Sequence, residues 1–379
     1  MANRNRGEHS ELLALLRVLH NGKLQLADSA GKPQGSWLRV IAAKLPSPPA
    51  DEFVICGENI EIRDSSGICR KVVPRSKIES LAEGLFKDIR TSVGASFSSS
   101  SADEAALLLE INDAKAPSKY KADILLTLAS PVFEGRKLIQ GFSVKSELGN
   151  PATLLNAGAT VFKYHLKAPE GCDPWLVQES LMEPGSDDYP VPTKLFPELR
   201  RAGVELDFIG VENAQFEENL RMIDTSFPKM LAAVLVQFYF GNIGGRKNEE
   251  DSPLEVLLGS PELISKLALS LGLSEAFVAK LLVHKFKDLL RQAALGMKPS
   301  KPWGGEVEAH GGWIVVNRDG QVSCFHLVND DEFRKYLLQS CRIERPSRSR
   351  HGTGYVCPPE NGHPRELNLS LQVRCILRD

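Results

Sequence analysis

Two short segments carry an acid and a base at positions from which both could act on one phosphate. Asp123 stands at the head of an alternating apolar run. The second run is Phe142-Ser-Val-Lys-Ser146, in which Phe142 and Val144 are expected to point to the core because side chains alternate across a strand. Ser143 and Lys145 share the opposite face. If the two runs are neighbouring strands, a carboxylate and an ammonium lie side by side at a sheet edge.

Phosphodiester hydrolysis uses that pair of groups. The carboxylate holds a divalent metal, which activates water and stabilises the leaving oxygen. The lysine orients the attacking water and offsets charge on the phosphate. The alternative is that Asp123 and Lys145 are ordinary surface residues of a hairpin. Spacing alone does not separate the two interpretations.

A helix near the start of the chain adds two more acids. Helical spacing places Glu8 within an apolar stripe of leucines and Glu11 at the border of that stripe. A carboxylate on a core-facing stripe costs free energy unless a cation or a metal meets it. For Glu8 the first turn offers another explanation, since the helix dipole favours acids there. We therefore favour Glu11 as the third acid of the centre.

The elements that must position these residues are visible in the hydrophobic pattern of the first half. Apolar residues three and four apart predict a helix over Glu8–Leu19. A Ser-x-x-Glu capping pattern predicts a second helix over Ser76–Ile89, capped by Ser76. The serine tract Phe97–Ser101 is expected to be a flexible connector before a helix over Ala102–Glu110. Alternating runs bounded by Gly, Pro and Asp predict strands: Lys23–Ala27, Trp37–Ala43, Phe53–Cys56, Ile60–Arg63, Asp123–Leu128 and Leu138–Ser146, the last two joined by a hairpin at Pro131–Gly135.

The second half changes from helical to β patterning. Phe216–Met297 is predicted to be largely helical, with a polar interruption at Gly241–Ser252. Strands are predicted over Trp313–Val316, Val322–Leu327 and Leu367–Leu377. This order indicates an α/β protein in three parts. These are a catalytic region over residues 1–190, a mainly helical region over 200–300 and a β-rich region over 303–379 that contributes DNA recognition.

Composition excludes several classes of protein. The formal net charge of −2 argues against a histone-like DNA binder but not against a clamp with local positive charge. No apolar run reaches the roughly 18 residues of a membrane span, and the polar start lacks a secretory signal. The seven cysteines include no CxxC pair, so we expect reduced thiols in a cytoplasmic protein. His310, His326 and His351 lack zinc-site spacing, and the stretch 241–246 lacks the Lys-Ser/Thr of a phosphate-binding loop.

The segment Gly141-Phe-Ser-Val-Lys-Ser-Glu-Leu-Gly149, followed by Pro151-Ala-Thr-Leu-Leu-Asn156, resembles the active-site segment of the HpaII family of type II restriction endonucleases. Shorter motifs follow that family's order over nearly the whole chain: Asn5-Arg-Gly-Glu-His-Ser-Glu11, Asn219-Leu-Arg-Met-Ile-Asp224 with Pro228, Gly296-Met297, Trp303-Gly304, Gly311-Gly-Trp-Ile-Val315, Arg345-Pro-Ser-Arg-Ser-Arg-His351 and Leu367-Asn-Leu-Ser-Leu-Gln-Val-Arg374.

The resemblance implies the PD-(D/E)XK nuclease fold, a mixed sheet flanked by helices with Mg²⁺ at the sheet edge. It implies Lys145 as the catalytic lysine and Asp123, Glu11 and Val144 as the metal site. The implied function is Mg²⁺-dependent cleavage of double-stranded DNA at a short site, with CCGG expected because the family's named member cleaves within CCGG. We expect a functionally paired DNA methyltransferase and a monomer or homodimer. The alternatives are an inactive DNA-binding protein of the same fold and a DNA repair nuclease.

The chain departs from the family pattern at three places. Ala122, not proline, precedes Asp123. Ser143 stands where most of the superfamily has an acid, as in other CCGG-cutting nucleases that draw the missing acid from elsewhere. Either Glu147 or Glu11 can supply that acid here. The stretch Ala159-Thr-Val-Phe162 replaces an expected Thr-Asn-Phe.

DNA contacts are expected from a basic loop and from the flanks of the catalytic strand. Arginine reads guanine through paired hydrogen bonds in the major groove. The loop 345–351 interleaves arginines with small residues, although a solvated loop or one that touches only phosphates has the same composition. The predicted contacts are Arg345, Arg348, Arg350 and His351 in that loop, Ser146, Thr153 and Asn156 near the catalytic strand, and Lys119 and Lys121 before Asp123.

Overall fold

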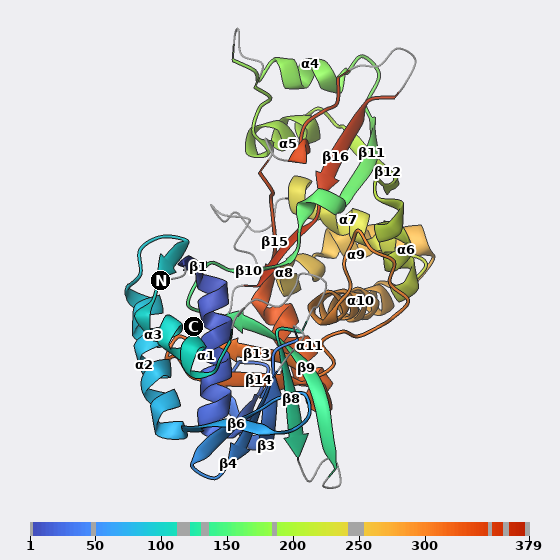
Figure 1. The fold of residues 1–379 in the computed structure, drawn as a ribbon. Coiled ribbons are helices and arrows are strands. Elements are labelled where there is room, and N and C mark those ends of the chain that lie inside the picture. Colours follow the sequence, from blue (N-terminus) through green and yellow to red (C-terminus); the bar gives the residue numbers. More distant parts are fainter. Residues whose placement is uncertain are drawn as a thin grey trace.

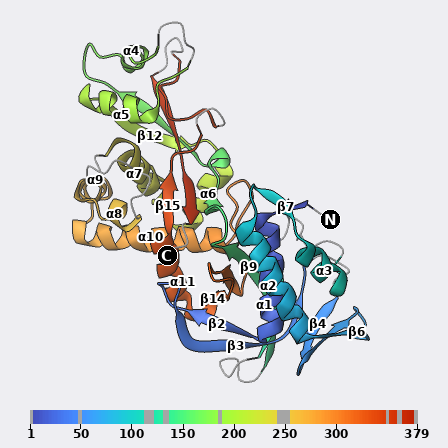
Figure 2. The ribbon, with the colours of Figure 1, turned by 90° about the vertical axis from the view of Figure 1, so that its left-hand side faces the viewer.

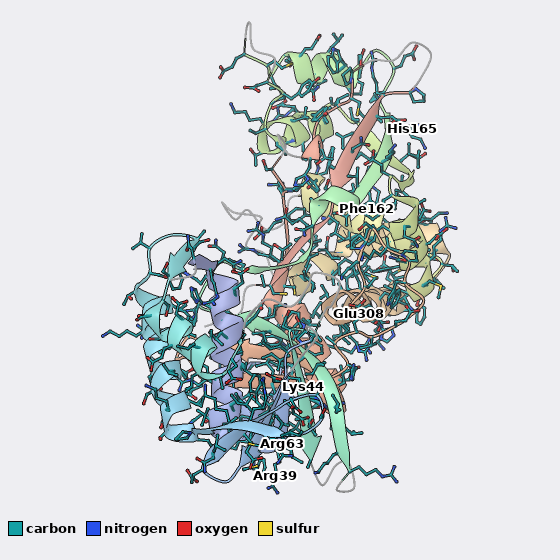
Figure 3. All side chains as sticks on the ribbon, viewed as in Figure 1. Arg39, Lys44, Arg63, Phe162, His165 and Glu308 are labelled. Atoms are coloured by element: carbon teal, nitrogen blue, oxygen red, sulfur yellow. The ribbon has the colours of Figure 1, made fainter. Side chains whose placement is uncertain are left out.

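Figure 1 shows the chain as a computed structural model, which describes residues 3–46, 51–111, 122–129, 136–183, 188–241, 254–347, 351–358 and 364–375. A large sheet and the helices α1 (Arg6–Asn21) and α2 (Arg75–Thr91) form one end of the molecule. The opposite end holds a small sheet with α4 (Pro174–Glu179) and α5 (Pro192–Arg201). Figure 3 shows the same separation in side chains, with Phe162 and His165 far from Arg39.

The large sheet has nine strands in the order β2-β14-β13-β9-β8-β3-β4-β5-β6. Two neighbouring pairs, β9–β13 and β2–β14, run parallel and the others run antiparallel, so the sheet is mixed. Strand β2 also pairs with β3, which closes a ring of pairings. The strands are β2 (Lys23–Ala27), β3 (Pro33–Lys44), β4 (Glu52–Cys56), β5 (Asn59–Arg63), β6 (Cys69–Pro74), β8 (Ile124–Ala129), β9 (Lys137–Ser146), β13 (Gly312–Val316) and β14 (Val322–His326).

Helices cover both faces of this sheet, and alternation along β13 shows why. Ile314 and Val316 belong to the hydrophobic cluster that includes α1, α2 and α3 (Ser100–Leu108). Trp313 and Val315 belong to a second cluster, which α10 (Glu275–Leu295) and α11 (Asp330–Ser340) build. Figure 2 shows α1 and α2 on one side of the sheet and α10 and α11 on the other. Because both faces are apolar, β13 is buried along its whole length.

Smaller sheets and helices complete the described chain. A three-stranded sheet of β12 (Glu205–Val211), β11 (Val161–Lys167) and β16 (Glu366–Ser370) packs on α7 (Phe227–Phe240). There the buried Tyr164 hydroxyl donates to the carbonyl of Ala232 at 2.9 Å. The remaining elements are β1 (Asn3–Asn5) with β7 (Ser96–Ser98); β10 (Ala152–Leu155), β17 (Gln372–Cys375) and β15 (Cys341–Glu344); α6 (Ala214–Ile223), α8 (Leu254–Leu258), α9 (Pro261–Leu271); and the 3-10 turns η2 (Ala157–Ala159) and η4 (Leu327–Asn329).

The predicted α/β class and mixed sheet are confirmed, and several local predictions are wrong. Ser76 does not cap α2, because β6 runs up to Pro74 and the helix already begins at Arg75. The serine tract is not a loose connector, since β7 pairs with β1 and the Ser99 side chain caps α3. The predicted last strand is two strands in different sheets, which separate where Leu371 donates to the carbonyl of Thr160.

Some elements of the structure were not predicted, and some predicted features lie outside the described residues. Strand β6 and helix α11 were not predicted, and the charged start of α11 hides its apolar face in the sequence. The hairpin at 131–135 and most of the interruption at 241–252 fall outside the description. The division at 1–190, 200–300 and 303–379 stays a prediction, although β13 and β14 share one sheet with the N-terminal strands. Within the described chain, none of the cysteines forms a disulfide.

Within the described chain, no single helix has the length and apolar content to cross a membrane, and only the bent pair α9 and α10 meets that composition jointly.

Candidate active site

Asp123 and the catalytic strand meet as the alternating pattern predicted. Strands β8 and β9 are antiparallel neighbours, with Ile124 opposite Phe142. The Asp123 amide donates to the Phe142 carbonyl at 2.7 Å. One carboxylate oxygen of Asp123 accepts from the Val144 amide at 2.7 Å and from the Ser143 hydroxyl at 3.1 Å. Asp123, immediately before β8, therefore holds its carboxylate against the C-terminal part of β9.

Lys145 lies in a polar cradle on the same strand. Its ammonium donates to the Ser143 hydroxyl at 2.7 Å and to the Val144 carbonyl at 3.0 Å. Ser143 is buried, with 2 % of its surface exposed. Because this hydroxyl donates to Asp123 and accepts from Lys145, it joins the acid to the base. A buried hydroxyl with both bonds satisfied fixes the two groups more firmly than a solvated pair would be fixed.

Glu11 comes to the same place from α1. It lines a cavity of about 610 Å³ together with Val144 and Lys145. It also lines a small cavity with Asp123, of about 10 Å³, close to the space that admits one water-sized group. The helix that carries Glu11 begins with a reciprocal capping box between Asn5 and Glu8. Three side chains from α1, β8 and β9 thus surround adjoining cavities.

Hydrogen bonds hold the start of α1 against the C-terminal end of β9. The hydroxyls of Ser10 and Ser146 lie 2.9 Å apart. The Arg6 guanidinium donates to the Leu148 carbonyl at 3.2 Å and to the Ser92 carbonyl at 3.0 Å. One residue at the start of α1 therefore joins the exit of β9 to the end of α2. Apart from the short N-terminal motif, no sequence pattern predicts these contacts.

Glu147, the other predicted donor of an acid, lies elsewhere. Its carboxylate accepts from the Arg318 amide at 3.0 Å in the turn between β13 and β14. Its own amide donates to the Val316 carbonyl at 2.9 Å. Burial raises the pKa of Glu147, against the opposing effect of that bond from Arg318. Glu147 lines neither cavity, so the structure brings Glu11 and not Glu147 to Asp123.

The donor set suits a hard divalent cation. Mg²⁺ binds through one or two carboxylates, with waters and substrate phosphate completing its shell. Glu11 and Asp123 supply two carboxylates beside a cavity of suitable size. Val144 lines the larger cavity together with Glu11. Among the described residues, no three His, Cys, Asp or Glu side chains gather into a group that could hold a metal by themselves.

The predicted DNA contacts are only partly described. Ser146 and Thr153 line the large cavity. The Arg345 guanidinium lies over two rings of α7, 5.3 Å from the centre of Phe238 and 5.6 Å from that of Tyr239. This cation–π packing anchors the base of the loop on α7. Arg348, Arg350, Lys119 and Lys121 lie outside the described residues.

Two further predicted contacts lie near the turn η2. Asn156 precedes the turn without a side-chain cap, and its carbonyl accepts from the Thr160 hydroxyl at 3.1 Å. The His351 ring lies close to Gly158 on the same turn. Val161 stands where the family pattern led us to expect an asparagine, and it is buried in the apolar core. No polar role is possible for that side chain.

His326 has a structural role in the large sheet. Its Nδ1 accepts from the Val328 amide at 2.9 Å, and its Nε2 lies 2.6 Å from the Gln140 side-chain oxygen. Burial, with a smaller contribution from His310, lowers the pKa of His326 to about 4. The ring is therefore neutral near pH 7 and bridges β14 to β9.

Two comparisons with known proteins match nearly the whole chain. The model of the HpaII restriction endonuclease family matches residues 5–375. The type II restriction enzyme HpaII of Haemophilus parainfluenzae is 29% identical over 373 residues, which cover 98% of this chain and 98% of that enzyme. No solved structure matches the chain.

Proposed function

This chain belongs to the HpaII restriction endonuclease family, which makes it a type II site-specific deoxyribonuclease, and we propose that it cleaves duplex DNA at CCGG with Mg²⁺ at a centre built from Asp123, Glu11 and Lys145. The observation that carries the proposal is the convergence of these three side chains, from three separate elements, on adjoining cavities. The mixed sheet with helices on both faces is compatible with the PD-(D/E)XK fold, to which we assign it.

The chain's own residues have distinct roles in this mechanism. Asp123, Glu11 and the Val144 carbonyl would hold Mg²⁺, which when bound activates water and stabilises charge on the leaving oxygen. Lys145 is held by Ser143 and the Val144 carbonyl, and it orients the attacking water and offsets the phosphate charge. Ser143 stands where most of the superfamily has an acid, and its hydroxyl orients Asp123 by donating to the carboxylate, while Glu11 supplies the second acid.

DNA recognition is assigned to the surroundings of the large cavity. Ser146 and Thr153 line that cavity, from which they reach phosphate oxygens of a bound strand. Arg348 and Arg350 remain our proposed readers of guanine, with His351 beside them. We also propose that the enzyme acts in the cytoplasm, as a monomer or homodimer, beside a DNA methyltransferase that protects the host's own sites.

Two alternatives have less support. An inactive DNA-binding protein has no need of a lysine held by a buried hydroxyl and a carbonyl beside two acids, and Asp123, Glu11 and Lys145 are all present. A repair nuclease would share these residues, but the family match over residues 5–375 favours restriction.

The function is tested by mapping cleavage products. The protein is incubated with Mg²⁺ and plasmid DNA that carries CCGG sites, and the ends are sequenced. Ends within CCGG are expected. Ends at another short sequence would overturn only the proposed site, whereas intact DNA across a range of metal and salt conditions would overturn the proposed activity.

The centre is tested by Lys145→Ala. We expect cleavage below about 1% of the wild-type rate, because a group that stabilises transition-state charge is lost. DNA binding should stay within about tenfold, or about 1.4 kcal/mol. The control is Lys77→Ala, since Lys77 is an exposed lysine of α2 that pairs with Glu104. A normal cleavage rate in Lys145→Ala would show that the centre is wrongly assigned.

A further inference from the structure

The Lys145 ammonium has a third neighbour, on the strand beside its own. It lies 5.3 Å from the centre of the Trp313 ring. Strands β9 and β13 run parallel, with Ser143 opposite Trp313 and Lys145 opposite Val315. The tryptophan therefore sits level with the serine that accepts from Lys145. A cation within about 6 Å of an indole centre is attracted by the negative face of the ring.

We propose that Trp313 is a positioning residue for Lys145, which it holds by a cation–π contact so that the ammonium faces the scissile phosphate. The inference rests on the proposed function, because it takes Lys145 as the catalytic lysine. It adds a residue from β13 to a centre that otherwise consists of α1, β8 and β9. Trp313 does not touch the reacting atoms and acts only through Lys145.

The indole itself is rigidly held. Trp313 has 0 % of its surface exposed, and its Nε1 donates to the Ala294 carbonyl near the end of α10 at 3.2 Å. Phe333 of α11 meets the ring edge-on, with centroids 5.5 Å apart. An aromatic face fixed on two sides by helices gives the flexible lysine side chain a defined place to rest. Without such a contact, the several rotatable bonds of the Lys145 side chain would let its ammonium take many positions.

The three contacts of the ammonium complement one another. Ser143 and the Val144 carbonyl accept two of its three protons. The ring of Trp313 attracts the charge without using a proton, so the third N–H stays available for water or phosphate. This division of contacts is what a lysine that orients the attacking water requires. A leucine at 313 would fill space but offer no such attraction.

Trp313 is also a core residue, so the experiment must separate packing from positioning. The variants are Trp313→Phe, which keeps an aromatic face, and Trp313→Leu, which does not. The control is Phe325→Leu. Phe325 lies directly opposite Trp313 on β14, is equally buried and packs on Phe333 and Tyr336. Single-turnover cleavage, DNA affinity and thermal unfolding are measured for each variant.

We expect Trp313→Leu to lower the cleavage rate by about tenfold while DNA affinity stays within about twofold. Trp313→Phe should recover most of that rate, and Phe325→Leu should lose stability without losing rate. Equal rates for Trp313→Leu and Phe325→Leu beside an inactive Lys145→Ala would overturn this inference and leave the proposed function intact. Normal cleavage by Lys145→Ala would overturn both.

A spectroscopic readout addresses the contact without catalysis. The fluorescence of Trp313 is obtained by subtracting the emission spectrum of Trp313→Phe from that of the wild-type protein. The same subtraction is made for two proteins that both carry Lys145→Met. A changed Trp313 emission when the ammonium is removed supports the contact. An emission that does not depend on residue 145 would overturn it, whatever the cleavage rates are.

Discussion

Ser143 shows how one residue changes the requirements of a catalytic strand. With a hydroxyl in place of an acid, β9 offers no carboxylate beside Asp123, so a second acid must come from another element. The sequence left both Glu11 and Glu147 as candidates for this acid, with Glu11 favoured as the third acid of the centre. The structure places Glu11 beside both cavities and binds Glu147 to the turn at Arg318. The two glutamates therefore differ in what they can do, although the sequence pattern allows either to supply the missing acid.

This difference leads to a prediction at the residue scale. Glu11→Gln should lower cleavage by at least about a hundredfold at limiting Mg²⁺, because a carboxylate binds the ion far better than an amide. Glu147→Gln should keep the rate within about threefold, since an amide oxygen can still accept from Arg318. The measurement is the cleavage rate across a Mg²⁺ titration. The reverse ranking of the two variants would transfer the role to Glu147.

At the scale of elements, the site depends on how closely β13 approaches β9. The Gly311 amide donates to the Gly141 carbonyl at 2.8 Å, and a Cβ on Gly311 would lie 2.5 Å from the Phe142 ring. Gly312 has φ 101°, and its Cβ would lie 2.0 Å from the Phe325 carbonyl oxygen. Two glycines in succession thus let Trp313 enter the sheet opposite Ser143.

The variant Gly312→Ala tests whether the start of β13 requires a glycine. A side chain there meets both an unfavourable φ and a backbone oxygen, so we expect a loss of more than about 3 kcal/mol in the free energy of unfolding. Gly35→Ala is the matched control, since Gly35 has φ 79° with no atom within 4 Å of its Cβ position. There the expected loss is about 1 kcal/mol. Urea unfolding measures both, and equal losses would refute the steric argument.

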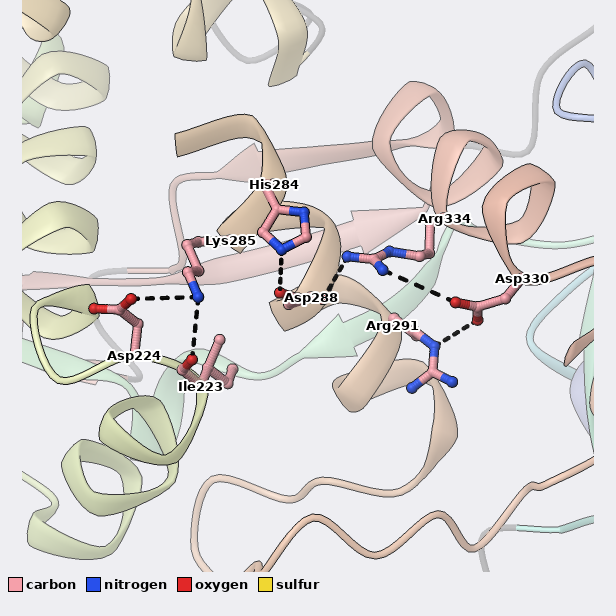
Figure 4. Close-up of polar contacts among 8 residues, drawn as sticks. All are labelled: Ile223, Asp224, His284, Lys285, Asp288, Arg291, Asp330 and Arg334. Carbon is pink, nitrogen blue, oxygen red and sulfur yellow. Dashed lines mark hydrogen bonds and ion pairs between the residues drawn. The ribbon is translucent and has the colours of Figure 1, made fainter. Parts of the chain in front are cut away.

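At the scale of the whole molecule, α10 connects parts that are far apart in sequence. Figure 4 shows charged side chains of α10 that bind both α11 and the corner between α6 and α7. Lys285 pairs with Asp224 at 3.3 Å, and Arg291 pairs with Asp330 at 2.5 Å. Arg334 of α11 lies between Asp330 and Asp288, the latter on α10. Half-buried ion pairs of this kind hold helices in one relative orientation more than they add stability.

Arg334→Met tests the network. It leaves two carboxylates near each other without their shared cation, so we expect a loss of about 1–2 kcal/mol in the free energy of unfolding. Arg201→Met is the control, because Arg201 forms an exposed i,i+3 pair with Glu198. That change should cost less than about 0.5 kcal/mol. Urea unfolding at low and high salt distinguishes them, and losses of equal size would show that the network adds nothing beyond a surface pair.

Much of the local structure was predictable because it depends on short-range periodicity. The leucine spacing of α1 and the alternation of β8 and β9 indicated these elements within a few residues of their ends. Alternation also placed Ser143 and Lys145 on one face. The chemistry that we propose for Asp123 and Lys145 rests on their residue types, and the order of short motifs indicated the family.

The tertiary structure decided which residues meet across long distances in sequence. No periodicity relates Glu11 to Asp123, or Trp313 to Lys145, because their contacts arise from the pairing of β9 with both β8 and β13 and from the packing of α1. Likewise, only the fold binds Glu147 to the turn at Arg318 and draws Arg345 onto the rings of α7. Side-chain type and spacing are local properties, whereas burial and proximity depend on the whole chain.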